Sequence, residues 1–233
     1  MIAQNNSNQQ QVLVVSSFDE LVHTAFSGKN NAINWQRNLE GDFEEIVNQL
    51  ILKDDITVIS IDDLNDLDLS KEGIKARNIL INDLQQLTDF GASPTLNLLK
   101  CYERDSEFDF ISTDVYSFHV DRSPIPTDTF LCTYYGAASD TVANEDAQQK
   151  ILIPEIREKL FELYDEHIDG FEDFLKEYFF DLHYQIRPGV EPINLGLGNL
   201  WRLAVDHPEQ KVLPCVHRAP KENKDEYRLL LIC

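Results

Sequence analysis

The sequence predicts an α+β protein with an antiparallel sheet as its core, helices before the sheet and a helical segment inserted into it. Short runs of aromatic and β-branched residues, separated by Pro, Gly, Asp and Asn, follow one another from residue 95 onward. Apolar residues recur instead at every third or fourth position in two longer segments, 71–90 and 154–182. We therefore expect one domain over residues 12–233, with a helical section at 12–94 and a β-rich core at 95–233 that contains the insertion 154–182.

The N-terminal section combines short strands with capped helices. Residues 1–11 are rich in Gln and Asn and are expected to be disordered. Two short helices are predicted where a capping residue precedes a Glu by three positions, from Ser17 to Glu20 and from Asp42 to Glu45. The runs VLVV and ITVISI are predicted to be strands, the second of them buried. A longer amphipathic helix is expected to end at Gly91.

The C-terminal section is predicted to supply most of the sheet. Its candidate strands are LNLLKCYER, VYSFHVD, TFLCTYYG, NLWRLAV, KVLPCVH and YRLLLIC. The segment RPGVEPINLGLG is expected to be a loop. Gly170 is expected to divide the insertion 154–182 into two helices, whose apolar stripe we expect to be buried against the sheet or in a homodimer.

Composition excludes several classes of protein. Lys and Arg number 20 against 41 Asp and Glu, so the formal net charge is −21 and binding to nucleic acid is not expected. No apolar run is long enough for a membrane span, and no secretory signal is evident at the N-terminus. The four cysteines have no CxxC spacing, which favours a reducing compartment. We therefore expect a cytoplasmic protein.

The strand FHVD carries the first candidate ligands of a metal. Residues two apart in a strand point the same way, so His119 and Asp121 present an imidazole and a carboxylate from one face. Cys215 and His217 have the same relation in a later strand. If the two strands are neighbours, His119, Asp121 and His217 form a two-histidine, one-carboxylate set. Such a set binds one face of an iron(II) ion and leaves positions open for substrate and dioxygen.

Arg228 is the candidate for binding a second carboxylate. It follows His217 by eleven residues and lies on the next strand, which a hairpin return would bring back over the site. A guanidinium offers the fixed pair of donors that the far carboxylate of a dicarboxylate cosubstrate requires.

The HxD pair, the distal His217 and the following Arg228 together resemble the Fe(II)/2-oxoglutarate dioxygenase superfamily. The resemblance covers residues 95–233. It implies a double-stranded β-helix of the jelly-roll, cupin-like type, with iron(II) and 2-oxoglutarate as cofactors and an unknown substrate that is hydroxylated. It also implies that Arg228 binds 2-oxoglutarate and that a tyrosine of the next strand, Tyr134 or its neighbour Tyr135, assists.

Further blocks resemble an uncharacterised bacterial family, catalogued as domain of unknown function eighteen-twenty-six. The blocks are AINWQR, FHVDR, LCTYYG and VHRAP followed by RLLLIC. That family implies no activity. The helical insertion is longer than a minimal dioxygenase core requires. Its role could be that of a lid, of a dimer surface or of a segment without a function of its own.

Two other functions remain open. Cys215 could join His119, Asp121 and His217 in a closed four-coordinate zinc site, which would make the protein a non-catalytic zinc-handling protein on the same fold. The acidic chain could also be an interaction protein without any metal. The remaining histidines gain nothing from their spacing, and His167 and His183 are expected to be packing or surface residues.

Overall fold

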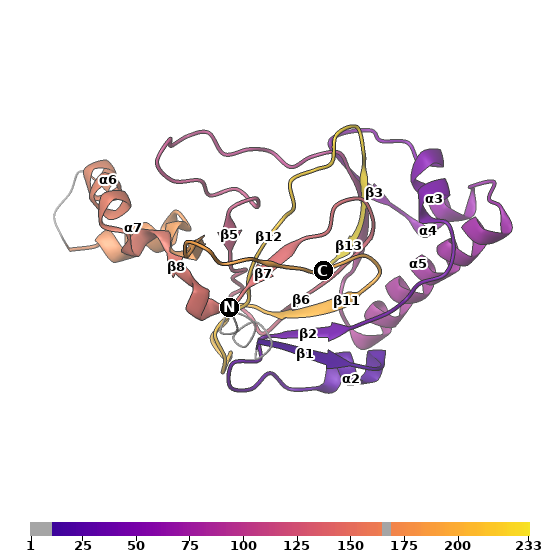
Figure 1. The fold of residues 1–233 in the computed structure, drawn as a ribbon, viewed down its shortest axis with the longest axis horizontal. Helices are drawn as coiled ribbons and strands as arrows, with labels where there is room; N and C mark the ends of the chain where they lie inside the picture. Colours follow the sequence, from indigo (N-terminus) through magenta and orange to yellow (C-terminus); the bar gives the residue numbers. More distant parts are fainter. Residues whose placement is uncertain (1–10, 165–168) are drawn as a thin grey trace.

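The computed structural model describes residues 11–164 and 169–233. It contains an α+β protein with two sheets and helices at opposite ends of the molecule (Figure 1). The large sheet has seven strands in the spatial order β1 (Val12–Val15), β2 (Ala32–Trp35), β11 (Leu200–Ala204), β6 (Asp128–Tyr135), β13 (Arg228–Ile232), β4 (Thr95–Leu99) and β3 (Ile56–Ile59). Only β1 and β2 are parallel; the other neighbouring pairs are antiparallel.

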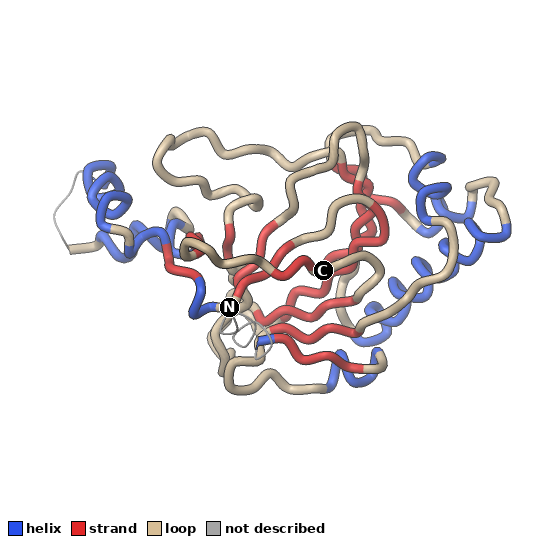
Figure 2. Tube along the Cα trace, in the orientation of Figure 1, coloured by secondary structure: helices blue, strands red, loops and turns tan. Residues whose placement is uncertain are grey.

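The small sheet is antiparallel throughout and curls beside the large one (Figure 2). Its order is β10 (Ile193–Asn194), β7 (Asp140–Val142), β12 (Val216–Arg218), β5 (Phe118–His119), β9 (His183–Ile186) and β8 (Ala147–Gln149). Every strand predicted from the sequence is present. The predicted loop RPGVEPINLGLG contains the short strand β10, which pairs with only two residues of β7.

The helices lie in two groups. The first group comes from the N-terminal section: α2 (Phe18–His23), α3 (Phe43–Gln49), α4 (Ile61–Asn65) and α5 (Lys71–Phe90). The second group, α6 (Pro154–Tyr164) and α7 (Phe171–Glu177), lies at the far end of the molecule (Figure 1). Short 3-10 turns complete the set at Asn144–Asp146, Lys150–Leu152 and Phe180–Leu182. In the described residues no helix combines the length and the apolar character that a membrane span requires.

The predicted helix boundaries in the N-terminal section are confirmed. Ser17 and Asp42 accept backbone hydrogen bonds three residues ahead, at the starts of α2 and α3. Helix α5 ends at Gly91, which is left-handed with φ of 99° and closes the last turn. The section is not only helical, however, because it supplies β1, β2 and β3 to the large sheet. Strand β3 is an edge strand with Ile56 and Val58 exposed, so the prediction that it is fully buried was wrong.

Alternation along the strands divides the large sheet into two faces. On the outer face, Phe130, Cys132 and Tyr134 of β6 pack in one core with α3 and α5. On the inner face, Leu131 of β6 packs with Leu230 of β13 and with Cys215, which adjoins β12 of the small sheet. By the same two-residue period, Thr129 and Thr133 belong to the inner face. The space between the two sheets is therefore reached by every second residue of β6.

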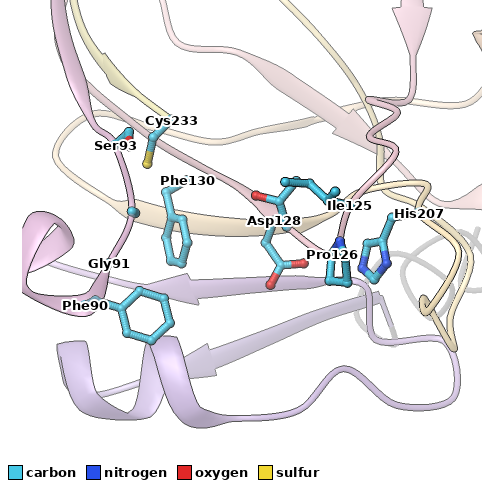
Figure 3. A pocket seen from close by; sticks show the side chains of 11 residues that line it. Phe90, Gly91, Ser93, Ile125, Pro126, Asp128, Phe130, His207 and Cys233 are labelled. Carbon is cyan, nitrogen blue, oxygen red and sulfur yellow. The ribbon is translucent and has the colours of Figure 1, made fainter.

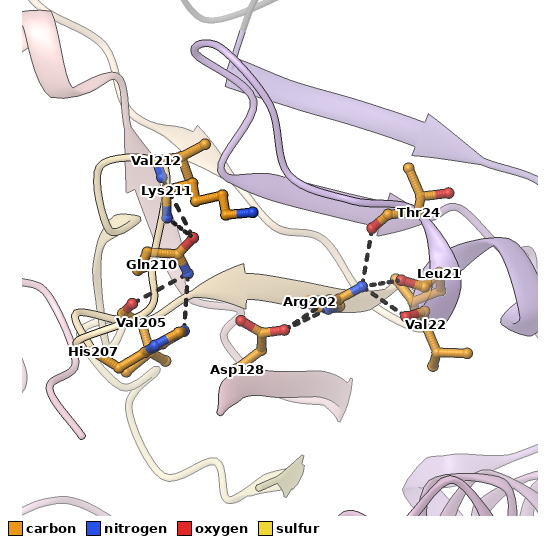
Figure 4. Close-up of polar contacts among 10 residues, drawn as sticks. All are labelled: Leu21, Val22, Thr24, Asp128, Arg202, Val205, His207, Gln210, Lys211 and Val212. Atoms are coloured by element: carbon orange, nitrogen blue, oxygen red, sulfur yellow. Dashed lines mark hydrogen bonds and ion pairs between the residues drawn. The ribbon is translucent and has the colours of Figure 1, made fainter. Parts of the chain in front are cut away.

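Arg202 of β11 fastens α2 to the sheet (Figure 4). Its guanidinium donates to the carbonyl oxygens of Leu21, Val22 and Thr24 at 2.8–3.2 Å, and it pairs with Asp128 at 2.7 Å. The last carbonyls of a helix have no partner within the helix and carry partial negative charge, so a cation at this end is stabilising. The start of β6 is thereby linked to the N-terminal section.

The insertion builds a small core of its own rather than packing flat on a sheet. Leu160 of α6 and Phe171 and Leu175 of α7 are buried together with Ile111, which comes from the loop between β4 and β5. The division at Gly170 is confirmed, since this residue is left-handed with φ of 102° and directly precedes α7. His167 lies outside the described residues. A homodimer through this segment stays a prediction.

Helix α5 offers a test of the N-terminal section. Ser70 accepts a hydrogen bond from the Gly73 amide at 3.1 Å and also contacts the Glu45 carboxylate of α3 at 2.6 Å. Ser70→Ala removes the cap and should lower the free energy of unfolding by about 1 kcal/mol, within the usual range for a lost N-cap. Urea denaturation measures the change, with Ser93→Ala, an exposed loop serine, as the control. An unchanged midpoint for Ser70→Ala would refute the capping role.

Candidate metal centre

Three predicted residues converge where β5 and β12 lie side by side. His119 and His217 are direct partners in the antiparallel ladder, so both imidazoles stand on the same face of the small sheet. Their ring centroids are 4.6 Å apart. Asp121 follows β5 by two residues and returns to that face, as the period of a strand predicts. The described residues contain a possible His-Asp-His metal-binding group at this point.

The distances suit a single ion. Asp121 Oδ1 lies 3.8 Å from His119 Nε2, and Oδ2 lies 3.7 Å from His217 Nε2. The candidate ligand atoms all lie within 4.8 Å of one another. Three ligand atoms bound at about 2.1 Å would stand roughly 3 Å apart in adjacent coordination positions. Side-chain rotations toward a common point would bring the three ligand atoms to that spacing.

Hydrogen bonds fix both imidazoles in the form that binds metal. His119 Nδ1 donates to the Ser117 carbonyl at 2.8 Å, and His217 Nδ1 donates to the Cys215 carbonyl at 3.1 Å. A carbonyl oxygen only accepts, so the proton of each neutral ring lies on Nδ1 and the lone pair lies on Nε2. Both lone pairs face Asp121. Backbone carbonyls behind ligating histidines are the usual second layer of a metal site.

The protonation states favour a divalent cation. Burial, together with the neighbouring His217, lowers the pKa of His119 to about 4. Burial alone would raise the pKa of Asp121, but His217, a hydrogen bond from Thr129 and His119 together hold it below its ordinary value. Near neutral pH the site therefore offers a neutral imidazole beside a carboxylate. That donor set suits Fe(II), Zn(II) and related ions.

Thr129 orients the carboxylate ligand. Its hydroxyl, on the inner face of β6, donates to Asp121 Oδ2 at 2.5 Å. Residues that hydrogen-bond to a metal ligand without touching the metal typically contribute about 10- to 100-fold to metal affinity. Thr129→Val keeps the shape but removes the donor, so we expect a tenfold or greater loss of affinity, measured by competition with a chromogenic chelator. Thr88→Val, which changes a helix hydroxyl bonded only to its own backbone, is the control. Equal affinity in Thr129→Val would show that this contact does not act on the ligand.

Arg228 is a buried cation on the inner face. It is 3 % exposed, and its Nη2 contacts the hydroxyls of Thr133 and Ser139 at 3.3 Å. Its Nε has no hydrogen-bond partner, and no carboxylate in the described part of the chain comes within 4 Å of its guanidinium. Burial lowers the pKa of Arg228, partly offset by Tyr102 and Glu222. An uncompensated buried guanidinium is costly, and a bound anion would relieve that cost.

Strand β6 connects the arginine with the metal ligands. Thr129 contacts Asp121 and Thr133 contacts Arg228, and both threonines point to the inner face of the same strand. Four residues of a strand span about 13 Å. Because both side chains reach inward from that strand, the guanidinium and the ligand set lie on the same side of the large sheet.

The predicted tyrosine lies on the wrong face. Tyr134 packs in the outer core, stacks on Phe43 with centroids 5.4 Å apart and donates its hydroxyl to Asp83 at 2.7 Å. Asp83 in turn pairs with the buried Arg37. The structure therefore does not bring Tyr134 to the metal ligands. Tyr135 lies at the end of β6, where Glu44 and Glu226 influence its pKa, which is raised mainly by burial.

Tyr102 is the tyrosine that approaches Arg228. It packs in the inner core, and the charge of Arg228 lowers its pKa against a larger upward shift from burial. Sequence reasoning missed it because it follows β4, outside the motif strands. Tyr102 comes three residues after the end of β4, in the run LNLLKCYER. Nothing in that run indicates a contact with Arg228.

Cys215 does not join the ligand group. Its Sγ contacts the Thr141 hydroxyl at 3.3 Å and the Gln11 side-chain amide at 3.8 Å. Burial raises the pKa of this thiol to about 12, so the sulfur is held protonated. The predicted four-ligand zinc set is therefore not assembled: only three of its members converge. Gln11 is itself buried, although it ends the segment that was predicted to be disordered; residues 1–10 lie outside the described part.

His183 lies beside the metal ligands and was not expected there. It is the ladder partner of His119 on β9 and is 5 % exposed. Burial lowers its pKa to about 3, helped by His119 and Lys150. Its position in the sequence predicted only a packing or surface residue, because the helical periodicity before it obscured the four-residue strand β9.

A separate hollow of about 610 Å³ lies beside the start of β6 (Figure 3). Phe90 and Phe130 face it, with Asp128 and His207 on its rim and Cys233 beside it. None of the three metal-site residues lines it, so it is distinct from the candidate metal centre.

Comparison with known proteins adds no identity. No family model, no curated protein and no solved structure matches the chain. Function must therefore be inferred from the residues and their geometry: a His-Asp-His group that could bind a metal, on the face of a curled antiparallel sheet.

Proposed function

We propose that the protein is a mononuclear non-haem iron(II) oxygenase that uses 2-oxoglutarate and hydroxylates an unknown substrate. The observation that carries this proposal is the buried, unpaired Arg228 on the same inner surface as His119, Asp121 and His217. A metal-storage or structural site has no use for a buried guanidinium at that place. A dicarboxylate cosubstrate, in contrast, needs one cation at each end.

The fold supports the same reading. A largely antiparallel seven-stranded sheet beside a curled antiparallel six-stranded sheet, with the ligands at adjacent strands of the smaller one, is consistent with a double-stranded β-helix. In this proposal the three ligands occupy one face of the ion and leave the other face for cosubstrate and dioxygen. The resemblance to the family of domain of unknown function eighteen-twenty-six is compatible with this assignment and supplies no reaction of its own.

Each residue then has a defined task. His119 and His217 present neutral Nε2 atoms because their Nδ1 protons are held by carbonyls, and Thr129 aligns Asp121. Arg228, positioned by the hydroxyls of Thr133 and Ser139, pairs with the distal carboxylate of 2-oxoglutarate. With iron(II) bound, the overall reaction would convert 2-oxoglutarate, dioxygen and substrate into succinate, carbon dioxide and the hydroxylated substrate.

Anaerobic addition of iron(II) and 2-oxoglutarate tests the proposal. The oxygenase should develop a weak visible charge-transfer band that iron(II) alone, or zinc(II) with 2-oxoglutarate, does not give. Stoichiometric metal without the band would favour the zinc-handling protein, which the three-ligand geometry also accommodates. Absence of stoichiometric metal would favour the acidic interaction protein, whose support is the net charge of −21.

A further inference from the structure

Three histidines form a row across the small sheet. His183 on β9 pairs with His119 on β5, which pairs with His217 on β12. Directly opposed residues of an antiparallel ladder share a face, so all three imidazoles point to the same side. The centroid of His119 lies 4.6 Å from that of His217 and 6.0 Å from that of His183. The candidate metal centre includes two of these rings, and His183 is not part of it.

His183 differs from its neighbours in its hydrogen bonds. The residue is 5 % exposed, and its enclosed Nδ1 has no hydrogen-bond partner among the described residues. Buried polar groups are nearly always satisfied, and an enclosed N–H without a partner is rarer than an enclosed acceptor. The favoured tautomer therefore carries its proton on Nε2. His183 thus offers an unused donor next to a metal ligand.

Lys150 supplies a second donor on the same side. Its Nζ donates to the Ser112 carbonyl at 3.0 Å and to the Ser117 hydroxyl at 2.7 Å, while the Ser117 carbonyl accepts from His119. An ammonium has three donors, so one remains. No carboxylate of the described chain lies within 4 Å of this Nζ. Gln149 of β8 pairs with Tyr184 of β9 in an antiparallel ladder, so the next residues on each side, Lys150 and His183, are neighbours along the same strand pair.

Nearby carboxylates do not take these donors. Asp105 and Asp114 stabilise the ammonium from a greater distance. Asp105 accepts from Thr113, and Asp114 accepts from the Tyr116 and Ser117 amides. Asp105 and Asp114 thus offset only part of the cost of burying the ammonium, and no carboxylate of the described residues accepts its remaining N–H group.

We propose that His183 and Lys150 form a subsite for the primary substrate and bind an acceptor oxygen of a carboxylate that the substrate carries. The subsite lies on the side of His119 away from His217, because β9 and β12 flank β5 on opposite edges. This inference rests on the proposed function only where it calls the bound molecule a substrate. Binding of a carboxylate to the subsite requires neither 2-oxoglutarate nor turnover. Arg228 keeps the separate task of binding the cosubstrate.

Acetate is the probe, and the imidazole nitrogens are the readout. The full chain, loaded with zinc(II) and labelled with ¹⁵N in histidine, is titrated with sodium acetate at constant ionic strength and pH 7.5. His183→Phe identifies the His183 resonances by their loss. We expect a saturable shift of the His183 Nε2 resonance, and an apparent acetate affinity at least tenfold weaker in Lys150→Met. Lys159→Met, an exposed lysine of α6, should match the wild type.

The outcomes are distinct. If His183 does not shift, or if Lys150→Met binds acetate as the wild type does, the subsite is refuted. Shifts confined to His119 and His217 would show acetate on the metal only and would also refute it. Unperturbed His119 and His217 resonances in Lys150→Met establish that this variant is folded; Lys150→Gln is the second variant, with the same expectation. Failure of 2-oxoglutarate to bind would overturn the oxygenase but leave the acetate result standing.

Discussion

Asp121→Ala should lose stoichiometric metal. Asp121 is the one charged member of the ligand group, and its two oxygens face Nε2 of His119 and of His217. Without it, two neutral imidazoles remain. We therefore expect the metal affinity to fall by more than a thousandfold, well beyond the about 10- to 100-fold typical of residues that only support a metal ligand. Equilibrium dialysis against micromolar iron(II) under argon, followed by elemental analysis, gives the measurement.

The control for this variant is another carboxylate. Asp109→Ala changes an exposed loop residue that is 93 % accessible and should bind metal as the wild type does. The fold should survive in Asp121→Ala, because the carboxylate is partly exposed and its one hydrogen-bond partner is Thr129. One equivalent of metal in Asp121→Ala, with a wild-type thermal transition, would place the metal elsewhere.

Arg228→Ala should retain metal and lose 2-oxoglutarate. The distal carboxylate of 2-oxoglutarate would be buried without a counter-charge, which costs about 3 to 5 kcal/mol, or roughly a hundredfold or more in affinity. Calorimetric titration of 2-oxoglutarate into the anaerobic iron(II) protein measures the difference. Because a cavity at this position also affects packing, Arg228→Met serves as a second variant of similar volume.

Arg187→Ala, which changes an exposed arginine after β9, is the matched control and should titrate as the wild type does. If Arg228→Ala and Arg228→Met both bind 2-oxoglutarate with wild-type affinity, the arginine has no part in cosubstrate binding. The zinc-handling alternative, which has no task for Arg228, would then fit better.

The sequence predicted the ligand group because its geometry is local. His119 and Asp121 are two residues apart, so the strand period alone puts them on one face. His217 required only that β5 and β12 be neighbours, and the ladder pairs it directly with His119. The N-terminal helix ends were predictable for the same reason, since caps such as Ser17 and Gly91 act within one turn.

Features that depend on register or on long-range pairing were not predictable. In the run TYY at residues 133–135, a shift of one residue in strand register decides whether Tyr134 or its neighbours face inward. The pairing of β6 with β11 and β13 sets this register. Strand β2 was missed because AINW is only four residues long between two helices. His183 was missed because β9 begins directly after a 3-10 turn, so its partner His119 could not be inferred from spacing.

Anomalous diffraction at the iron edge, from crystals grown anaerobically with iron(II), would locate the metal directly. We expect one strong peak bonded to Nε2 of His119, Nε2 of His217 and a carboxylate oxygen of Asp121, each at about 2.0 to 2.2 Å. We also expect no bond to Cys215, whose sulfur contacts Thr141 and Gln11. A peak ligated by the Cys215 sulfur, or a peak away from these three side chains, would contradict this assignment.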